Sequence, residues 1–99
     1  MLSHNVYFWL KPDLTDAQRA EFVAALEALR EVPSVGTFLL GTPAGVADRP
    51  VVDKTFDYSV TCLFDDLEAH NAYQVHPLHV AFVELGKQLW SDVKIYDAD

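Results

Sequence analysis

The 99-residue sequence contains little cysteine and few basic residues. The single cysteine, Cys62, excludes an internal disulfide and any metal centre built from several cysteines. Seven Lys and Arg stand against fifteen Asp and Glu, which gives a formal charge of -8. A surface of that sign repels the phosphates of nucleic acids and of anionic lipid headgroups. We therefore expect neither a nucleic acid nor a membrane surface as a partner.

The sequence also lacks a long apolar segment. Its longest uncharged run, residues 32–47, is interrupted repeatedly by proline and glycine. It falls short of the ~18 to 20 apolar residues that a membrane-spanning helix needs. The first five residues lack the basic and then apolar pattern of a secretory signal. We expect a soluble, intracellular, cytoplasmic protein.

What the sequence does contain is a large share of hydrophobic residues, 51%, without a polar or repetitive tract. This composition and length predict one domain over residues 1–99. A chain of this size buries only about 60–70% of the surface that its unfolded form exposes. An aromatic-rich core of this size therefore favours association with a second subunit.

Local patterns predict four strands and two helical units in the order β-α-β-β-α-β. Period-two alternation of apolar residues marks strands, and recurrence at three and four residues marks helices. Thr15 and Gln18 form a capping-box signature at the start of the first helix, and Pro33 follows its end. Asp65 or Asp66 starts the second unit. The predicted strands cover residues 4–11, 35–40, 56–64 and 91–96, the loop 41–54, and the helices 15–32, 65–73 and 76–90.

The second helical unit is interrupted at His76-Pro77. Proline suits the first position of a helix, so we place His76 at the N-cap of the segment that runs to about Trp90. The element order is that of a ferredoxin-like α+β fold, a four-stranded antiparallel sheet with both helical units on one face. The residues predicted to face the helices are His4, Val6 and Phe8 on the first strand and Tyr58, Val60 and Cys62 on the third.

The other face of the sheet has no helix to cover it. It carries Tyr7, Trp9, Leu39, Leu63 and Tyr96, a group too apolar to remain in water without cost. The sheet of a second copy is the natural cover. We therefore predict a two-fold homodimer through this face.

Histidines gather around the break between the helical segments. His70, His76 and His79 flank it, and His4 begins the strand that the helices should cover. The positive end of a helix dipole disfavours imidazolium, so a neutral imidazole able to accept a proton is expected at this junction. The hydroxyl of Tyr73 could then hydrogen-bond a substrate carbonyl or donate a hydrogen bond to the imidazole. The structural alternative is that His76 only caps the helix and Tyr73 only fills the core.

A metal interpretation of these histidines also exists. His76 and His79, three residues apart, could combine with His4 in a three-nitrogen site of the catalytic zinc type. Such a pair without a dedicated carboxylate is common by chance, and we expect no metal and no cofactor. Cys62 fits a small buried apolar residue better than a nucleophile. The acidic residues 65–68 fit the start of a helix.

Several segments together resemble the stress-responsive A/B barrel (Dabb) family across nearly the whole chain. The most specific is Tyr73-x-x-His76-Pro77-x-His79 at the start of the last helix. The others are His4-Asn5-Val6-Tyr7-Phe8, Thr15-x-x-Gln18, Val32-Pro33 and Trp90 followed by Tyr96-Asp97. The resemblance implies a dimeric α+β barrel in which two sheets pack face to face.

Within this family the chain is similar to a polyketide cyclase, which implies aldol closure of a poly-β-keto thioester without a cofactor. His79 then falls on the acid/base position and Tyr73 on its partner. The pocket position of a histidine on the third strand carries Tyr58 here, and Leu26 replaces an aromatic residue. The remaining implied pocket residues are His4, His76, Val6, Phe8, Phe22, Val23, Phe38, Val60, Phe82, Trp90 and Ile95.

Three functions follow as hypotheses. The first is a cofactor-independent lyase or cyclase in which His79 removes a proton next to a carbonyl and Tyr73 stabilises the enolate. The second is a non-catalytic stress-responsive protein whose pocket holds a small apolar carbonyl or aromatic ligand. The third is a cofactor-free monooxygenase of the related barrel type, which rests on analogy of fold.

Overall fold

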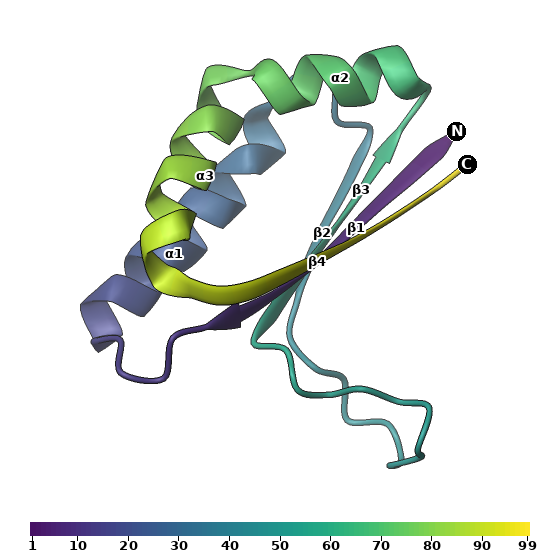
Figure 1. The fold of residues 1–99 in the computed structure, drawn as a ribbon. Helices are drawn as coiled ribbons and strands as arrows, with labels where there is room; N and C mark the ends of the chain where they lie inside the picture. The colour runs from purple at the N-terminus through teal and green to yellow at the C-terminus, as the bar shows by residue number, and fades with distance from the viewer.

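A four-stranded antiparallel sheet with all helices on one face makes up the structure, a computed structural model that describes residues 1–99 (Figure 1). The strand order is β2-β3-β1-β4. The strands are β1 Leu2–Leu10, β2 Thr37–Gly41, β3 Tyr58–Phe64 and β4 Trp90–Ala98. The helices are α1 Asp16–Ala28, followed by the short 3-10 turn η1 Leu29–Glu31, then α2 Leu67–Val75 and α3 Pro77–Leu89. The predicted ferredoxin-like α+β fold is confirmed.

The helix starts form as their capping residues predict. The Thr15 hydroxyl accepts from the Gln18 N–H at 3.1 Å, and the Gln18 side chain accepts from the Thr15 N–H at 2.8 Å. Of the two candidate caps for α2, Asp66 is the one used, and its carboxylate accepts from the Ala69 N–H at 2.9 Å. These bonds satisfy N–H groups that have no partner inside the helix.

The break at His76-Pro77 divides the second helical unit into α2 and α3. Helix α2 continues two residues beyond Tyr73, to Val75, and Pro77 opens α3. His76 is the N-cap, as predicted, and its Nδ1 accepts from the Leu78 N–H at 3.1 Å. None of the helices combines the length and the apolar character that a membrane crossing requires.

The third strand begins at Tyr58, two residues later than predicted. Asp57 bonds to the end of β1 instead of entering the strand: its N–H donates to the Phe8 carbonyl at 2.8 Å, and its carboxylate accepts from the Leu10 N–H at 2.7 Å. Phe56 therefore lies in the loop, with its ring 5.0 Å from that of Tyr7.

The second and fourth strands also differ from the predicted bounds. Val35 is held in a turn, where its N–H donates to the Val32 carbonyl at 3.1 Å, so β2 starts only at Thr37. Strand β4 is longer than the predicted 91–96 because its pairing with β1 extends from Trp90 to Ala98.

The core lies between the helices and the face of the sheet that they cover. Alternate residues of β1 and β3 point into it, as the period-two pattern predicts, and Tyr58 at the start of β3 is half-buried. His4 is the one buried polar residue among them, 2% exposed. The buried apolar residues of the sheet and of helices α1, α2 and α3 are Leu2, Val6, Phe8, Leu10, Phe38, Val60, Cys62, Phe64, Phe22, Leu26, Tyr73, Phe82 and Leu89.

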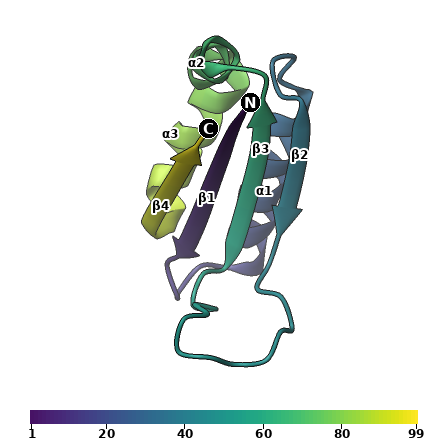
Figure 2. The ribbon, with the colours of Figure 1, turned by 90° about the vertical axis from the view of Figure 1, so that its right-hand side faces the viewer.

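The opposite face of the sheet carries no helix, as Figure 2 shows from the open side. Tyr7, Trp9 and Leu63 are half-buried there, while Leu39 and Tyr96 are each 62% exposed. The loop between β2 and β3 extends past the end of the sheet (Figure 2). The aromatic face predicted to need a cover is thus open in the single chain.

Candidate active site

A small, mainly apolar pocket of about 230 Å³ lies beneath α3, on the side of the sheet where β4 forms the edge. Three of its residues carry groups able to exchange or share a proton: His4 from β1, Tyr73 from α2 and His79 from α3. The pocket is lined by these three and by Val6, Phe8, Leu29, Val60, Gln74, Phe82, Val83, Trp90, Val93 and Ile95.

The break between α2 and α3 orients His79. Its Nδ1 lies 3.1 Å from the backbone carbonyl oxygen of Gln74. That carbonyl belongs to the last turn of α2, where no further helical N–H is available to it. Because a carbonyl can only accept, Nδ1 carries the proton and donates it. The lone pair of neutral His79 is therefore on Nε2.

Burial also keeps His79 neutral. Desolvation lowers the pKa of His79 below 6.5, and the hydrogen bond to the Gln74 carbonyl opposes it with a smaller effect. The sequence predicts a neutral imidazole from the positive end of the helix. In the structure His79 is also expected to be neutral, but the largest cause of its lowered pKa is burial. The arrangement provides a proton acceptor at neutral pH.

Tyr73 provides a proton donor beside it. The Tyr73 and His79 ring centroids are 4.6 Å apart, and Tyr73 is 1% exposed. Burial, together with a hydrogen bond from its hydroxyl to the Cys62 sulfur, raises the pKa of Tyr73 far above its ordinary value. The phenol therefore keeps its proton throughout the physiological range. When the surroundings of two neighbouring groups keep one protonated and leave the other able to accept a proton, the two are typical of an acid and base pair.

Cys62 lies beneath this pair as a buried thiol, as predicted. Burial raises the pKa of the thiol to about 11, which the hydrogen bond from Tyr73 opposes only weakly. The thiol therefore stays protonated and is a poor nucleophile. Its sulfur is a weak acceptor, so the Tyr73 hydroxyl can exchange it readily for a better one.

His4 is held by a carboxylate from the paired strand. Its Nδ1 lies 2.5 Å from an oxygen of Asp97, which stands opposite it in the β1–β4 register. Burial lowers the pKa of His4, and Asp97 opposes the change with a smaller effect. The carboxylate accepts from Nδ1–H, so Nε2 of the neutral ring carries the lone pair. The His4 ring centroid lies 5.9 Å from that of Tyr73.

The structure brings together most, but not all, of the residues that the sequence assigns to a pocket. His4, Val6, Phe8, Val60, Tyr73, His79, Phe82, Trp90 and Ile95 line it. The others lie elsewhere: His76 caps α3, and Tyr58 is half-buried against Phe22. Phe22 and Leu26 of α1 and Phe38 of β2 belong to the packed core, whereas Val23 of α1 is only half-buried. Phe22 and Leu26 of α1 are fully buried and do not line the pocket.

Four lining residues are not anticipated by the sequence analysis: Leu29, Gln74, Val83 and Val93. Two of them follow a visible pattern. Val83 is four residues after His79 on the same helical face, and Val93 is two residues before Ile95 on the same strand face. The sequence also misses Asp97 as the partner of His4, because the pairing register of the first and last strands is not visible in it.

The histidines do not form the three-nitrogen group considered for a metal. The side chain of His76 is engaged with the Leu78 N–H. The group of potential ligands that does converge is His4, His70 and Asp97, whose ligand atoms all lie within 4.8 Å of one another.

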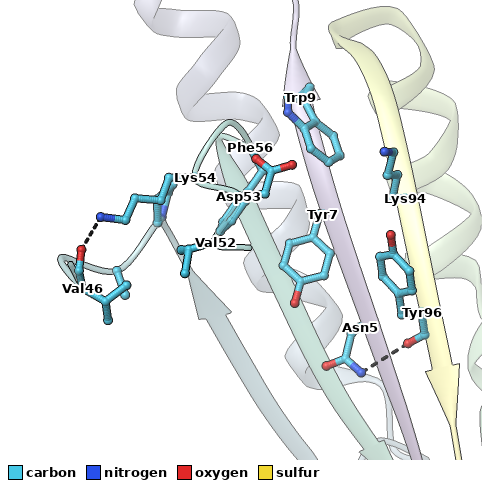
Figure 3. A pocket seen from close by; sticks show the side chains of 12 residues that line it. Asn5, Tyr7, Trp9, Val46, Val52, Asp53, Lys54, Phe56, Lys94 and Tyr96 are labelled. Carbon is cyan, nitrogen blue, oxygen red and sulfur yellow. Dashed lines mark hydrogen bonds between the residues drawn. The ribbon is translucent and has the colours of Figure 1, made fainter. Parts of the chain in front are cut away.

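A second, larger cavity of about 630 Å³ lies on the open face of the sheet (Figure 3). Tyr7 stands at its centre, 6.2 Å from the Tyr96 ring. The Trp9 indole donates to the Thr55 hydroxyl at 2.9 Å, and the Lys94 ammonium lies 5.7 Å from the Trp9 ring centroid. The loop between β2 and β3 forms the other wall. This cavity contains no histidine, so the buried imidazoles lie only in the smaller pocket.

The covered sheet, with an imidazole acceptor and a phenol donor in a small apolar pocket, defines a ferredoxin-like α+β protein with a candidate acid/base site. The chain belongs to the Stress responsive A/B Barrel Domain (Dabb) family, whose model matches residues 2–99. The family resemblance of the sequence is thereby confirmed.

Named relatives agree with this assignment. Olivetolic acid cyclase of Cannabis sativa is 22% identical over 97 residues, covering 97% of this chain and 93% of the relative. Hydroxynitrile lyase from Passiflora edulis has the same fold with a TM-score of 0.80 at 18% identity, covering 98% of this chain and 90% of the lyase. A Dabb family protein from Mesorhizobium loti gives a TM-score of 0.78 at 25% identity, covering 99% and 94%.

A solved structure of the same fold is described as dimeric. It is a ferredoxin-like protein of Thermobifida fusca, with a TM-score of 0.78 at 21% identity, covering 98% of this chain and 88% of its own. A second neighbour of the same fold that is described as dimeric comes from Bacteroides fragilis.

Proposed function

We propose that this Dabb protein is a cofactor-independent lyase or cyclase that acts on a small carbonyl compound. One observation carries the proposal: His79 presents an Nε2 lone pair next to the permanently protonated Tyr73 in an apolar pocket. Relatives named as a cyclase and as a lyase are consistent with chemistry of this kind.

In the proposed reaction His79 acts as the base. Its Nε2 takes a proton from the carbon next to the substrate carbonyl, and the Gln74 carbonyl stabilises the imidazolium that forms at Nδ1–H. The Tyr73 hydroxyl leaves the Cys62 sulfur and donates to the carbonyl oxygen, which becomes an enolate. The enolate then attacks a second carbonyl in a ring closure and forms an alkoxide that must be protonated. In the reverse direction His79 instead removes the proton of a β-hydroxyl group, the carbon–carbon bond breaks to give a carbonyl and an enolate, and the enolate carbon must be protonated. The proton returns from His79 to the product.

His4 is the third polar group of the proposed site. Asp97 holds its ring so that neutral Nε2 can accept a hydrogen bond from a substrate hydroxyl. In this assignment His4 binds the substrate, and Asp97 positions His4. The apolar lining contributes burial of the rest of the substrate.

The size of the pocket limits the substrate. Its volume of about 230 Å³ is below the roughly 300 Å³ at which pockets for drug-sized ligands begin. The single chain therefore favours a compact carbonyl compound over a long polyketide chain.

The open face of the sheet is the proposed homodimer interface. Tyr7, Trp9, Leu39, Leu63 and Tyr96 lie there together, and the partner's sheet would remove them from water. The neighbours that are described as dimeric support this arrangement. The interface would cover the larger cavity and leave the smaller pocket on the helix side.

Exchange of carbon-bound protons tests the base without knowledge of the natural substrate. A panel of small ketones and β-keto esters is incubated with the protein in D₂O, and loss of the proton signal next to the carbonyl is followed by NMR. We expect His79→Ala to lower the rate by about 10²- to 10⁴-fold. Tyr73→Phe tests the donor. His76→Asn, which changes a histidine outside the pocket and keeps a helix cap, is the control and should exchange at the wild-type rate.

The alternatives give different results in the same experiment. Saturable ligand binding without proton exchange by the wild-type protein would refute the enzyme and favour the ligand-binding hypothesis. Oxygen consumption with quinol-like substrates would favour the monooxygenase. Equal exchange by wild type and His79→Ala would remove His79 from the reaction.

A further inference from the structure

Three potential metal ligands converge at the end of the molecule where the two termini meet. His4 comes from β1, His70 from α2 and Asp97 from β4. The N- and C-terminal ends lie side by side below α2 in both views (Figures 1 and 2). One ligand atom of each residue lies within 4.8 Å of the others, a separation that small side-chain movements can reduce to that of ligands sharing one ion.

The surroundings of His4 hold its ring in place for metal binding. The side chain is 3% exposed, and its Nδ1 is directed at Asp97. The proton on Nδ1 is shared with Asp97 across 2.5 Å. An ion between the two would take the place of that proton, which would move to Nε2 so that the ring stays neutral. The packed rings of Phe64 and Tyr73, 6.2 and 5.9 Å away, restrain the His4 ring.

His70 faces His4 with a preset tautomer. The two ring centroids are 5.1 Å apart. Nδ1 of His70 lies 3.1 Å from the Asn71 side-chain oxygen, which can only accept, so Nδ1 carries the proton. Nε2 then has the lone pair and takes a hydrogen bond from the Gln74 amide at 3.3 Å. A metal-binding histidine whose other nitrogen donates to an oxygen is the usual arrangement in proteins.

The three potential ligands are open to solvent on the side of Asp97. Its side chain is 43% exposed, whereas that of His4 is 3% exposed. An ion can therefore enter from the Asp97 side and keep a water molecule in the remaining position. Two imidazoles, one carboxylate and a water match the ligand preference and coordination number of Zn²⁺.

We propose that His4, His70 and Asp97 form a binding site for a divalent transition metal of the Zn²⁺ class. The site shares His4 with the proposed substrate pocket, whereas the proposed proton transfers use His79 and Tyr73 and need no metal. Because His4 also lines the pocket, a bound ion fixes the His4 ring and places a positive charge beside the substrate. The site would thus act on the pocket as a modulator.

Titration with ZnCl₂ or CoCl₂ in a non-chelating buffer tests the proposal by calorimetry and by the visible absorption of Co²⁺. We expect one ion per chain for the wild-type protein. His70→Ala and Asp97→Asn, both outside the buried core, should lose this stoichiometric binding while keeping the wild-type circular dichroism. Asn71→Ala removes the group that fixes the His70 tautomer and should weaken binding by about 10- to 100-fold.

The matched control is His76→Asn, which removes a nearby histidine that belongs to no ligand group in the structure. It should bind with wild-type affinity. Loss of binding in His76→Asn with retention in His70→Ala would overturn the proposed ligand set. Absence of one-to-one binding to the wild-type protein would overturn the site itself. Both results leave the proton-exchange test of His79 untouched, so the two proposals fail independently.

Discussion

At the scale of single residues, burial of two neutral histidines links stability to pH. Burial lowers the pKa of both His4 and His79 below 6.5, so the unfolded chain binds more protons than the folded chain when the pH falls below that value. The contribution of these two histidines to the free energy of unfolding should therefore be complete above pH 6.5. It should decrease as the pH falls toward their lowered pKa values. Urea denaturation at a series of pH values between 8 and 5 measures the slope.

The matched comparison is His79→Gln, which keeps a polar side chain and removes one of the two titrating groups. Its unfolding free energy should decrease less steeply over the same pH interval. A variant with the wild-type slope would show that His79 contributes nothing to this linkage. The unprotonated form of His79 persists down to its lowered pKa, so the rate of the proposed proton exchange should also decrease as the pH falls below 6.5.

Asp97 partly offsets the effect of burial on the pKa of His4. Its hydrogen bond and its charge both raise the pKa of His4 against the larger effect of burial. Asp97→Asn keeps the size of the side chain and removes the charge, so the pKa of His4 should fall further. Titration of the His4 ring signals by NMR, in the wild type and in Asp97→Asn, measures this change. An unchanged or raised pKa of His4 would contradict the assigned contact.

Individual contacts of the site differ in whether local sequence patterns could predict them. The cap at His76 follows from local sequence, because a cap bonds only to the next turn of its own helix. The hydrogen bond from His79 to Gln74 depends on the angle at which α2 meets α3, and the pair of His4 and Asp97 depends on the register of two strands 93 residues apart. Neither geometry is encoded in a short window of sequence.

At the scale of elements, the period of the apolar residues determines which face of each strand is buried, and this was predictable for β1 and β3. The extent of the pocket was not. Phe22 and Leu26 of α1 share the periodicity of Phe82 in α3, yet α1 packs directly on the sheet, whereas α3 leaves a space over β1 and β4. How tightly two similar helices pack is a property of the assembled layers.

Gly86 of α3 determines the position of one pocket wall. A Cβ at Gly86 would lie 2.1 Å from a ring carbon of Trp90, a distance that real atoms do not reach. Gly86→Ala must therefore displace the Trp90 ring. We expect a destabilisation of about 1–3 kcal/mol from overpacking, which exceeds the 0.5–1 kcal/mol that alanine gains over glycine in a helix.

Gly45→Ala is the control for this substitution, because a Cβ there meets nothing within 4 Å. Chemical denaturation gives the stability of both variants, and tryptophan fluorescence reports on the ring. Gly86→Ala should change the emission spectrum and Gly45→Ala should not. A Gly86→Ala protein as stable as the wild type would show that Trp90 has other room to occupy.

At the scale of the whole molecule, the two faces of the sheet have different proposed functions. The helix-covered face holds the pocket with its acid and base, and the open face holds the aromatic surface for a second copy. In the single chain Tyr96 of β4 stands 62% exposed on the open face, so replacing it removes little internal packing. A substitution of Tyr96 should therefore affect the association of two copies without affecting the folding of each.

Tyr96→Glu should convert the dimer into a folded monomer. The partner's sheet would have to cover the new carboxylate and remove it from water, which is unfavourable, and Lys94 in the same cavity offsets only part of this cost. Sedimentation equilibrium measures the mass, and circular dichroism checks the fold. Val80→Glu, at a residue of α3 that is 49% exposed on the other side of the molecule, is the control and should remain dimeric. A wild-type protein that sediments as a monomer, or a dimeric Tyr96→Glu variant, would show that the copies do not associate through this face.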